Sequence, residues 1–335
     1  MKVSIMLTSY NLVDYIDTSI KSVIDLEKPC DWELLIGDDG STDGTVEKIQ
    51  AWIEKYPENI KLYQIPRDSG SVKLGSRAAY NRAYLLEQAT GDYLNYLDGD
   101  DCYLGTERLK VQIEHLERPE YAQCSCCGHN IEAYVIPANR RYRMTRGNIT
   151  QQVFTKQEYV GRRLYFHTNT IVFRKECKTM LLDSLYRCYL NDVFITFILL
   201  QYGSILYIPE AWCQYNMTGT GLWTGHSKVY GYFRNVQIYD LESSICPELE
   251  SAIMDKYFKE FLYINKHYKA EQIKEIQPLF KNAPEDVFKA STSFFKLEGR
   301  TRSENKIKRQ VLWEAHMAQL KFLFKSVLRK LKLAK

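Results

Sequence analysis

Short apolar runs alternate with stretches of helical periodicity over the first hundred residues of the chain. The short runs predict strands at 3–7, 34–36, 60–65 and 93–97, and the longer stretches predict helices near 16–24, 46–52 and 77–88. Asp43 is expected to be the N-cap of the second helix. This alternation is typical of βαβ units, so the sequence predicts an α/β fold with a mainly parallel sheet flanked by helices.

The pattern is less regular between about residues 102 and 215. It predicts a helix at 109–116, strands near 130–135 and 170–173, and a buried helix at 192–200. Beyond about residue 230 the chain is rich in Lys, Glu and Tyr and has helical periodicity without a strand signal. We therefore expect one α/β domain over 1–228 and a helical C-terminal region over 229–335.

Arginines gather at 140–143, with Arg146 close behind. This segment is expected to form an exposed basic loop. A second basic segment lies at the C-terminus, where Phe324, Leu328 and Leu331 recur at helical spacing among lysines and arginines. Such a tail is suited to lying on an anionic membrane surface. Packing on a partner helix is the alternative for the tail.

Length, charge and cysteine content limit the class of protein. A chain of 335 residues is long enough for one α/β core and a smaller appendage, and a formal net charge of +4 is too small to indicate nucleic-acid binding. The nine cysteines show no spacing typical of a disulfide scaffold, which favours a reducing cytoplasm. The longest apolar run, 193–200, is far shorter than the roughly 20 residues that cross a bilayer, so no membrane span is expected.

Polar clusters follow three of the predicted strands. They occupy residues 8–11, 38–45 and 98–101. Ligands of an open parallel sheet bind beyond the carboxyl ends of its strands, so the three clusters are expected to meet at one rim.

The third cluster carries three carboxylates within four residues, Asp98, Asp100 and Asp101. Such carboxylates repel one another unless solvent or a cation compensates their charge. Mg²⁺ and Mn²⁺ favour oxygen ligands of this kind and complete their shells with phosphate oxygens, so a nucleotide-diphosphate is the natural partner. An acidic turn that caps a helix at 104–116 is the alternative.

Four segments in this order and spacing resemble the inverting glycosyltransferase family 2, over roughly residues 1–215. They are residues 4–11, 36–45 and 91–101 and the pair Asn191-Asp192. The resemblance implies the GT-A fold, which is Rossmann-like, and sugar transfer from a nucleotide-diphosphate donor that depends on Mn²⁺ or Mg²⁺.

The resemblance also implies roles for single residues on the rim. Thr8, Tyr10 and Asp39 would hold the nucleoside, with Asp39 accepting a hydrogen bond from the base. Asp98 would face the ribose and the metal, and Asp100 would bind the metal directly. For Asp39, turn chemistry and helix capping are the alternative, and both roles can coexist.

Inverting transfer needs a base that removes the acceptor proton, and Asp192 is the candidate. It lies at the start of an apolar helix, where the family usually places Glu-Asp, although this chain has Asn191 in the first position. Capping of the helix at 193–200 is the alternative role of Asp192.

Two further segments are candidates for ligand contacts. Arg77 is a candidate donor contact, although the family's Ala-Arg-Asn pattern is altered here, with Tyr80 in the place of the arginine. The glycine-rich loop with Gly221, Trp223 and His226 is a candidate acceptor or lid loop. Alternatively, Trp223 anchors a plain surface loop.

These expectations describe a cytoplasmic enzyme, with a peripheral place on the inner face of the cell membrane as a further expectation. It would transfer a hexosyl or N-acetylhexosaminyl group, with UDP-sugar as donor, to a hydroxyl of a glycan or glycolipid acceptor in the synthesis of cell-surface polysaccharide or lipooligosaccharide. A nucleotidyltransferase and a non-catalytic module that binds sugar nucleotides or glycans are the alternatives.

Overall fold

The structure is a computed structural model that describes residues 1–65, 77–144, 149–162, 165–183, 186–187, 189–218, 235, 238–239 and 241–253. The chain divides into two compact units, Met1–Thr224 and Gly225–Lys335. The first unit contains the sheet and the site residues that the structure describes. Most of the predicted helical region over 229–335, including the basic tail, lies outside the described residues. The predicted domain bounds stay a prediction.

One ten-stranded sheet forms the centre of the first unit, in the order β3-β2-β1-β4-β9-β6-β10-β5, with β7 beside β6 and β8 beside β10. The strands are β1 (Lys2–Ser9), β2 (Asp31–Asp38), β3 (Ile60–Gln64), β4 (Tyr93–Asp98), β5 (Cys102–Tyr103), β6 (Cys124–Val135), β7 (Arg140–Arg143), β8 (Gln152–Phe154), β9 (Val172–Arg174) and β10 (Ser204–Met217). The sheet confirms the predicted α/β class.

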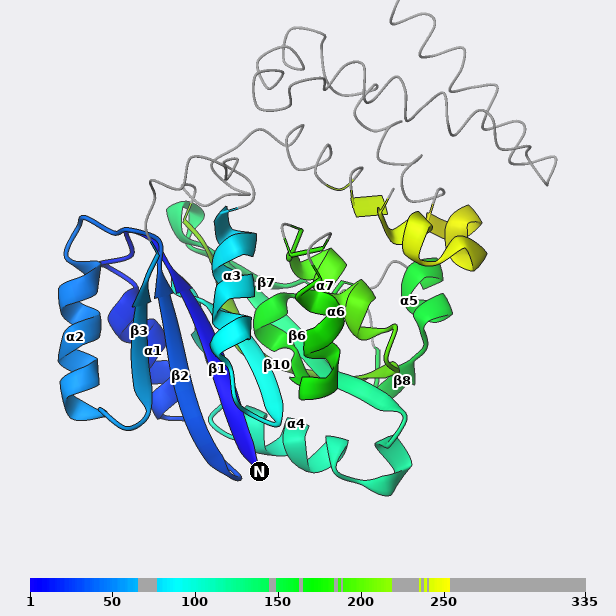
Figure 1. The fold of residues 1–335 in the computed structure, drawn as a ribbon, viewed down its shortest axis with the longest axis horizontal. Helices are drawn as coiled ribbons and strands as arrows, with labels where there is room; N and C mark the ends of the chain where they lie inside the picture. The colour runs from blue at the N-terminus through cyan, green and yellow to red at the C-terminus, as the bar shows by residue number, and fades with distance from the viewer. Residues whose placement is uncertain are drawn as a thin grey trace, which may run out of the picture. The chain divides into compact units, whose positions relative to one another are not determined.

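Seven α-helices lie in the described part of the first unit: α1 (Ile16–Ile24), α2 (Thr45–Lys55), α3 (Arg77–Gln88), α4 (Arg108–Leu116), α5 (Lys156–Arg162), α6 (Lys178–Leu181) and α7 (Asp192–Leu199). Short 3₁₀ turns lie at η2 (Pro119–Tyr121), η3 (Ile136–Ala138), η4 (Thr168–Thr170), η5 (Lys175–Cys177) and η6 (Pro247–Leu249). Figure 1 shows α3 on one face of the first strands and α1 and α2 on the other. Because helices cover both faces, β1 reads as a nearly continuous apolar run, and Val3, Ile5 and Leu7 are fully buried.

The direction of the strands gathers their carboxyl ends at one edge. β1 runs parallel to β2 and β4, β2 runs parallel to β3, and β6 runs parallel to β10. β9 is antiparallel to both β4 and β6, so β4 and β6 point the same way. The ends of β1, β2, β4, β6 and β10 therefore form one rim, as expected from the sequence.

Close packing of α3 on the sheet fixes two arginines near this rim. A Cβ atom at Gly37 of β2 would lie 2.0 Å from Oδ1 of Asn81, so only glycine lets the helix approach this closely. The side-chain amide of Asn81 donates to the carbonyl of Gly37 at 2.7 Å. Arg77 and Arg82, on the same helix, are thereby held beside the polar ends of the strands.

Two local expectations are wrong. The arginines at 140–143 form a strand, β7, because they pair with β6. The strand expected near 170–173 is present as β9, which begins at Val172, after the 3₁₀ turn η4. The N-cap of α2 is Gly44, whose φ is 95°, and not Asp43. Asp43 instead accepts hydrogen bonds from the amide groups of Val13 and Thr45 at 3.1 Å.

A buried carboxylate ties the amino ends of β1, β2 and β4 together. Glu33 of β2 accepts hydrogen bonds from the Lys2 ammonium at 2.7 Å, from the Ser4 hydroxyl at 2.6 Å and from the amide of Thr90 at 2.9 Å. Burial alone would raise its pKa, but these hydrogen bonds lower the pKa of Glu33 to about 2. Glu33 is therefore ionised near neutral pH and stabilises the fold far from the rim.

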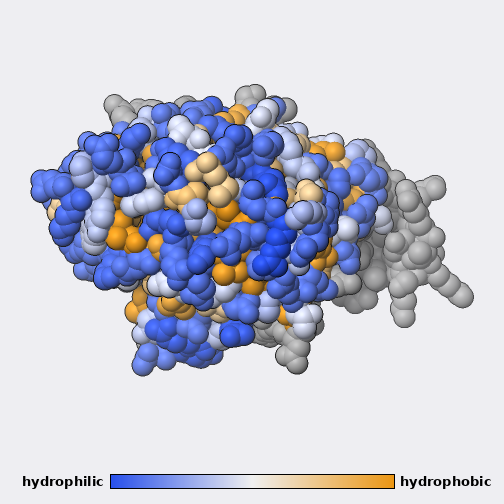
Figure 2. Space-filling model, turned by 90° about the horizontal axis from the view of Figure 1, so that it is seen from below, coloured by the Kyte–Doolittle hydropathy of each residue, from blue (hydrophilic) through white to orange (hydrophobic). Residues whose placement is uncertain are grey.

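Hydrophilic and apolar residues are mixed on the described surface. On the face seen in Figure 2, apolar residues lie in small areas separated by hydrophilic ones. None of the helices in the described ranges combines the length and apolar character that crossing a membrane requires. The described cysteines are all free thiols.

Candidate active site

The acidic cluster lies in a tight turn between β4 and β5. The amide of Asp101 donates to the carbonyl of Asp98 at 2.9 Å, and the amide of Gly99 donates to the carbonyl of Thr8 at 2.8 Å. A Cβ atom at Gly99 would lie 2.8 Å from that carbonyl oxygen, so glycine is required where the turn meets β1. The turn is thus fixed against β1, with its three carboxylates at the rim.

Asp98 is held by contacts from three directions. Its carboxylate accepts from the Thr8 hydroxyl at 2.9 Å and from the Arg82 guanidinium at 2.6 Å, and its amide donates to the Asn169 side chain at 3.1 Å. The side chain keeps 22% of its surface exposed. Asp98 is therefore oriented by the fold and still open to a ligand.

The next two carboxylates lie deeper. Asp101 accepts from the side-chain amide of Asn169 at 2.6 Å and from the backbone amide of Asn216 at 2.7 Å. Burial and the neighbouring charges of Asp100 and Asp98 raise the pKa of Asp101 well above its usual range. Burial and Asp98 likewise raise the pKa of Asp100 to about 7. Packing three carboxylates this closely leaves negative charge that a cation would compensate.

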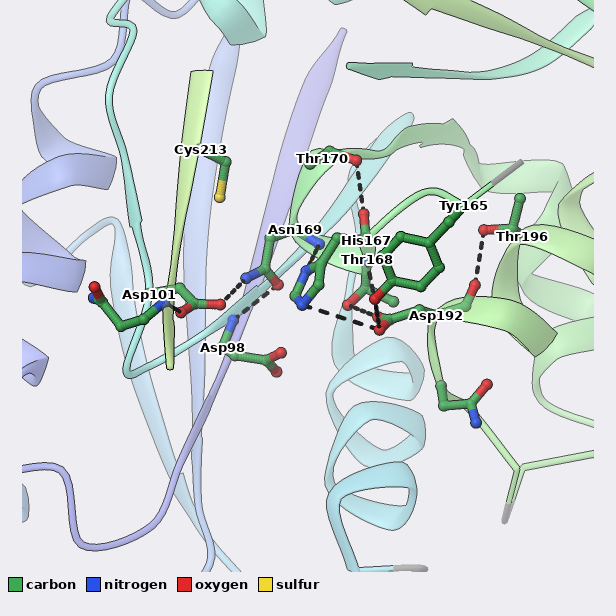
Figure 3. Close-up of polar contacts among 12 residues, drawn as sticks. Asp98, Asp101, Tyr165, His167, Thr168, Asn169, Thr170, Asp192, Thr196 and Cys213 are labelled. Carbon is green, nitrogen blue, oxygen red and sulfur yellow. Dashed lines mark hydrogen bonds and ion pairs between the residues drawn. The ribbon is translucent and has the colours of Figure 1, made fainter. Parts of the chain in front are cut away.

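His167 of the segment before η4 completes a donor set with two of these aspartates. One ligand atom each from Asp98, Asp101 and His167 lies within 4.8 Å of the other two (Figure 3). Carboxylate oxygens suit Mg²⁺ and Mn²⁺, and imidazole is a common ligand of transition metals, so the set fits a divalent cation such as Mn²⁺. Asp100, which the sequence predicts as the direct ligand, is not in this set, and its ligand role stays a prediction.

Asp192 lies beside His167 at the start of α7. Its carboxylate accepts from the Tyr165 hydroxyl at 2.6 Å, and from the amide and hydroxyl of Thr168 at 3.0 and 2.8 Å (Figure 3). Nε2 of His167 lies 4.0 Å from Oδ2 of Asp192. Burial acts to raise the pKa of Asp192, but His167, Arg82 and these hydrogen bonds lower it overall. Asp192 is therefore an ionised carboxylate, and 14% of its side chain is exposed.

The capping role suggested for Asp192 is wrong, because Asn191 is the N-cap of α7. The side chain of Asn191 accepts a hydrogen bond from the amide of Phe194 at 3.0 Å. Asp192 is the first helical residue, and its carboxylate is directed at Tyr165 and Thr168 instead. The helix end is satisfied without it, which leaves Asp192 available for chemistry.

The predicted nucleoside contacts lie beyond β1 and β2. Nε of Arg77 lies 2.8 and 2.9 Å from the two carboxylate oxygens of Asp39, and a further guanidinium nitrogen donates to Oδ1. Tyr10 is 41% exposed at the end of β1. The structure thus brings Thr8, Asp39 and Arg77 to the same rim as Asp98. Gly221, Trp223 and His226 lie outside the described residues.

The sequence model described as "Glycosyl transferase family 2" matches residues 4–181, more than half of the 335-residue chain. The chain belongs to glycosyltransferase family 2. A Bacillus subtilis protein named "Putative teichuronic acid biosynthesis glycosyltransferase TuaG" is 39% identical over 114 residues, which are 34% of this chain and 41% of that protein. Putative glycosyltransferase EpsE of the same species is 34% identical over 122 residues, 36% of this chain and 41% of that protein. The chain thus spans about two fifths of the length of these curated relatives.

Solved structures of other proteins share the fold of this chain. Staphylococcus aureus TarS superposes with a TM-score of 0.64 at 16% identity, covering 96% of this chain and 54% of that chain. TarS 1-349 in complex with UDP-GlcNAc gives a TM-score of 0.61 at 19% identity, covering 87% of this chain and 81% of that chain. At these identities the likeness establishes the fold, which is GT-A as expected.

Several residues that lie at the rim in the structure are not predicted as site residues by the sequence. His167, Asn169 and Asn216 are single polar residues in irregular or strand segments, and only the meeting of η4 and β10 with the acidic turn brings them together. The sequence does not mark Arg82 as a site residue, because an arginine on an amphipathic helix is expected to lie on the surface. In the structure Arg82 is buried and its guanidinium contacts the carboxylate of Asp98.

Proposed function

We propose that this family 2 protein is an inverting glycosyltransferase that moves a hexosyl or N-acetylhexosaminyl group from UDP-sugar to an acceptor hydroxyl. The observation that carries the proposal is the position of Asp192. Its partly exposed carboxylate lies beside His167, one of three residues that fit a divalent cation. Inverting transfer requires such a base next to, but apart from, a metal-diphosphate site.

Donor binding is assigned to the first half of the rim. Thr8, Tyr10 and Asp39 would hold the nucleoside, and Arg77 would act through its ion pair with Asp39. UDP as the nucleotide is supported by the structure of TarS in complex with UDP-GlcNAc and by an Escherichia coli relative named as a UDP-Glc transferase, 35% identical over 111 residues.

A divalent cation would be held by Asp98, Asp101 and His167, with Asp100 as a further candidate ligand. When bound, such an ion stabilises the charge that develops on the leaving diphosphate. A mannosyltransferase of Pyrobaculum calidifontis with the same fold, at a TM-score of 0.51, was solved with GDP-Man and Mn²⁺. That structure supports Mn²⁺ as the first ion to test.

The transfer step uses Asp192 as the general base. The acceptor oxygen forms a bond to the anomeric carbon while the bond from that carbon to the diphosphate oxygen breaks, and the acceptor proton passes to Asp192. The hydrogen bonds from Tyr165 and Thr168 hold the carboxylate in one orientation for this step. Attack from the side opposite the leaving group inverts the anomeric configuration.

The acceptor belongs to the chemistry of cell-surface polymers. The relatives are named for teichuronic acid biosynthesis and, in a Bacillus spizizenii protein 34% identical over 110 residues, for poly(ribitol-phosphate) glucosylation. A place at the inner face of the cell membrane, with the basic tail on anionic lipid, is part of the same proposal.

A panel of UDP-sugars incubated with the protein and Mn²⁺ tests the proposal. We expect slow hydrolysis of one donor to UDP and free sugar, which disappears in the Asp98→Asn variant. Binding of a donor without hydrolysis or transfer by any member of the panel would instead favour a non-catalytic binding module.

A further inference from the structure

β7 is an edge strand at the level of the acidic turn. It pairs with β6 alone among the described strands, with Arg141 opposite Tyr134 of β6. Tyr134 is in turn opposite Asn216 of β10, the residue whose amide binds Asp101. The arginines of β7 therefore lie on the same rim as the candidate active site, on the side away from the nucleoside end at β1 and β2.

A chain of hydrogen bonds joins β7 to the acidic turn. Arg141 donates to the side-chain oxygen of Gln214, and the amide of Gln214 donates to Oδ1 of Asn216 at 2.8 Å. Asn216 then donates from its backbone to Asp101 and from its side chain to the carbonyl of Asp100, both at 2.7 Å. The position of the basic strand is thus fixed relative to the site and not left to a free loop.

The strand carries more positive charge than its surroundings neutralise. Arg140, Arg141 and Arg143 are exposed, and Arg141 pairs with Glu132 at 2.7 Å. In the described part of the chain, no carboxylate lies within 4.0 Å of Arg140 or Arg143. The guanidinium of Arg140 lies over the ring of Tyr142, with 5.5 Å between its central carbon and the ring centroid.

We propose that β7 is a binding subsite for an acceptor chain that carries phosphodiester groups, and this rests on the proposed function. The acidic turn repels an anionic acceptor, so such an acceptor needs fixed cations near the transfer site but outside the turn. All the cations on the strand are arginines, and the planar guanidinium group of an arginine can donate hydrogen bonds to two oxygens of one phosphate. Arg140 and Arg143, which have no carboxylate within 4.0 Å in the described part of the chain, supply two such groups at the two ends of this short strand.

The double variant Arg140→Gln and Arg143→Gln tests the subsite in the full chain. It removes two cations and spares Arg141, which contacts the acidic turn through Gln214 and Asn216. Arg118→Gln is the matched control, because Arg118 is equally an exposed arginine but precedes the amino end of β6. A fluorescent oligo(glycerol phosphate) is the probe, with a neutral oligosaccharide and an oligouronate of equal length for comparison.

We expect the double variant to bind the phosphate probe about tenfold more weakly than wild type in anisotropy titrations at low salt, as loss of charge-assisted hydrogen bonds implies. Arg118→Gln should bind as wild type does, and the double variant Arg140→Lys and Arg143→Lys should keep part of the affinity. Raising the salt concentration should weaken wild-type binding more than binding by the double variant.

Two results would overturn the subsite: equal affinity of wild type and double variant for the phosphate probe, or no binding by wild type. Equal binding of the oligouronate would overturn the choice of phosphate. UDP binding with Mn²⁺, measured on the same preparations, keeps the two proposals apart. If UDP binding fails, the proposed function fails, and if it persists while the probe results fail, only the subsite is wrong.

Discussion

Replacing Asp192 with Asn changes one atom of the carboxylate and removes the proton acceptor. In the wild type, Oδ1 accepts from Thr168 and Oδ2 accepts from the Tyr165 hydroxyl. An asparagine keeps the Thr168 hydrogen bonds through its oxygen. Its NH₂ group then donates to the Tyr165 oxygen, which reverses the direction of a single hydrogen bond. The site therefore keeps its shape while it loses its charge.

The size of each effect follows from these contacts. Two charge-assisted hydrogen bonds become neutral ones, and one is reversed, which should lower the free energy of unfolding by about 1–2 kcal/mol. Loss of a general base typically slows the step about 10²–10⁴-fold, which corresponds to roughly 3–5 kcal/mol in the barrier. The kinetic effect should thus exceed the effect on stability.

The assay combines transfer rates with calorimetric titration of UDP in the presence of Mn²⁺. We expect transfer by Asp192→Asn to fall by about 10²–10⁴ while UDP affinity stays near wild type. Asn191→Ala is the matched control, because it removes the cap of α7 at a cost of about 1 kcal/mol but leaves the carboxylate in place. Normal transfer by Asp192→Asn would refute the reasoning, and loss of UDP binding would place Asp192 in the donor site or the fold instead.

Other predictions concern the metal ligands, the buried carboxylate and the tail. Asp100→Ala should abolish turnover. His167→Ala should raise the Mn²⁺ concentration that is needed for half-maximal UDP binding, which titration with the metal measures. An unchanged Mn²⁺ requirement would exclude His167 as a ligand. Glu33, whose pKa is lowered to about 2, stabilises the fold fully above its ordinary value of 4.5 and loses this contribution as pH falls toward 2. Urea unfolding should therefore find Glu33→Gln less stable than wild type by about 3 kcal/mol at pH 7, with a gap that narrows below pH 4.5. A chain ending near residue 300 should lose binding to anionic vesicles in flotation assays while keeping activity on a soluble acceptor; equal binding by both forms favours a helix-packing role for the tail.

The sequence predicts the first half of the fold well, because its strands and helices have clear apolar periods. β1, β2, β4 and α3 fall where buried runs and helical spacing indicate. β7 was missed because arginines have no strand signal of their own, and the strand exists through its pairing with β6. The local sequence pattern thus predicts strands and helices that have a buried apolar face. It does not predict an edge strand that forms through pairing with a neighbouring strand.

The candidate site also contains residues that the local sequence pattern predicts and residues that it does not. Asp98 and Asp100 stand out in the sequence because they follow the apolar run of a strand, and Asp192 stands out because it precedes the apolar run of a helix. His167 and Asp98 belong to a cluster that could hold a metal ion. The two residues are distant in the sequence, and no local motif connects them. Asn191 differs from the family's usual residue, and the structure explains why the change is tolerated: asparagine caps α7. Long-range placement by the sheet accounts for what the sequence could not predict.

The central claim is that the acidic rim binds a nucleotide-diphosphate through a divalent cation. Calorimetric titration of UDP into the full chain, once with Mn²⁺ and once with EDTA, tests it most directly. Without a cation, no positive charge joins the carboxyl groups of the acidic turn to the diphosphate, so the account predicts binding with Mn²⁺ and a loss of affinity of at least about tenfold with EDTA. Equal UDP affinity under the two conditions would contradict the account.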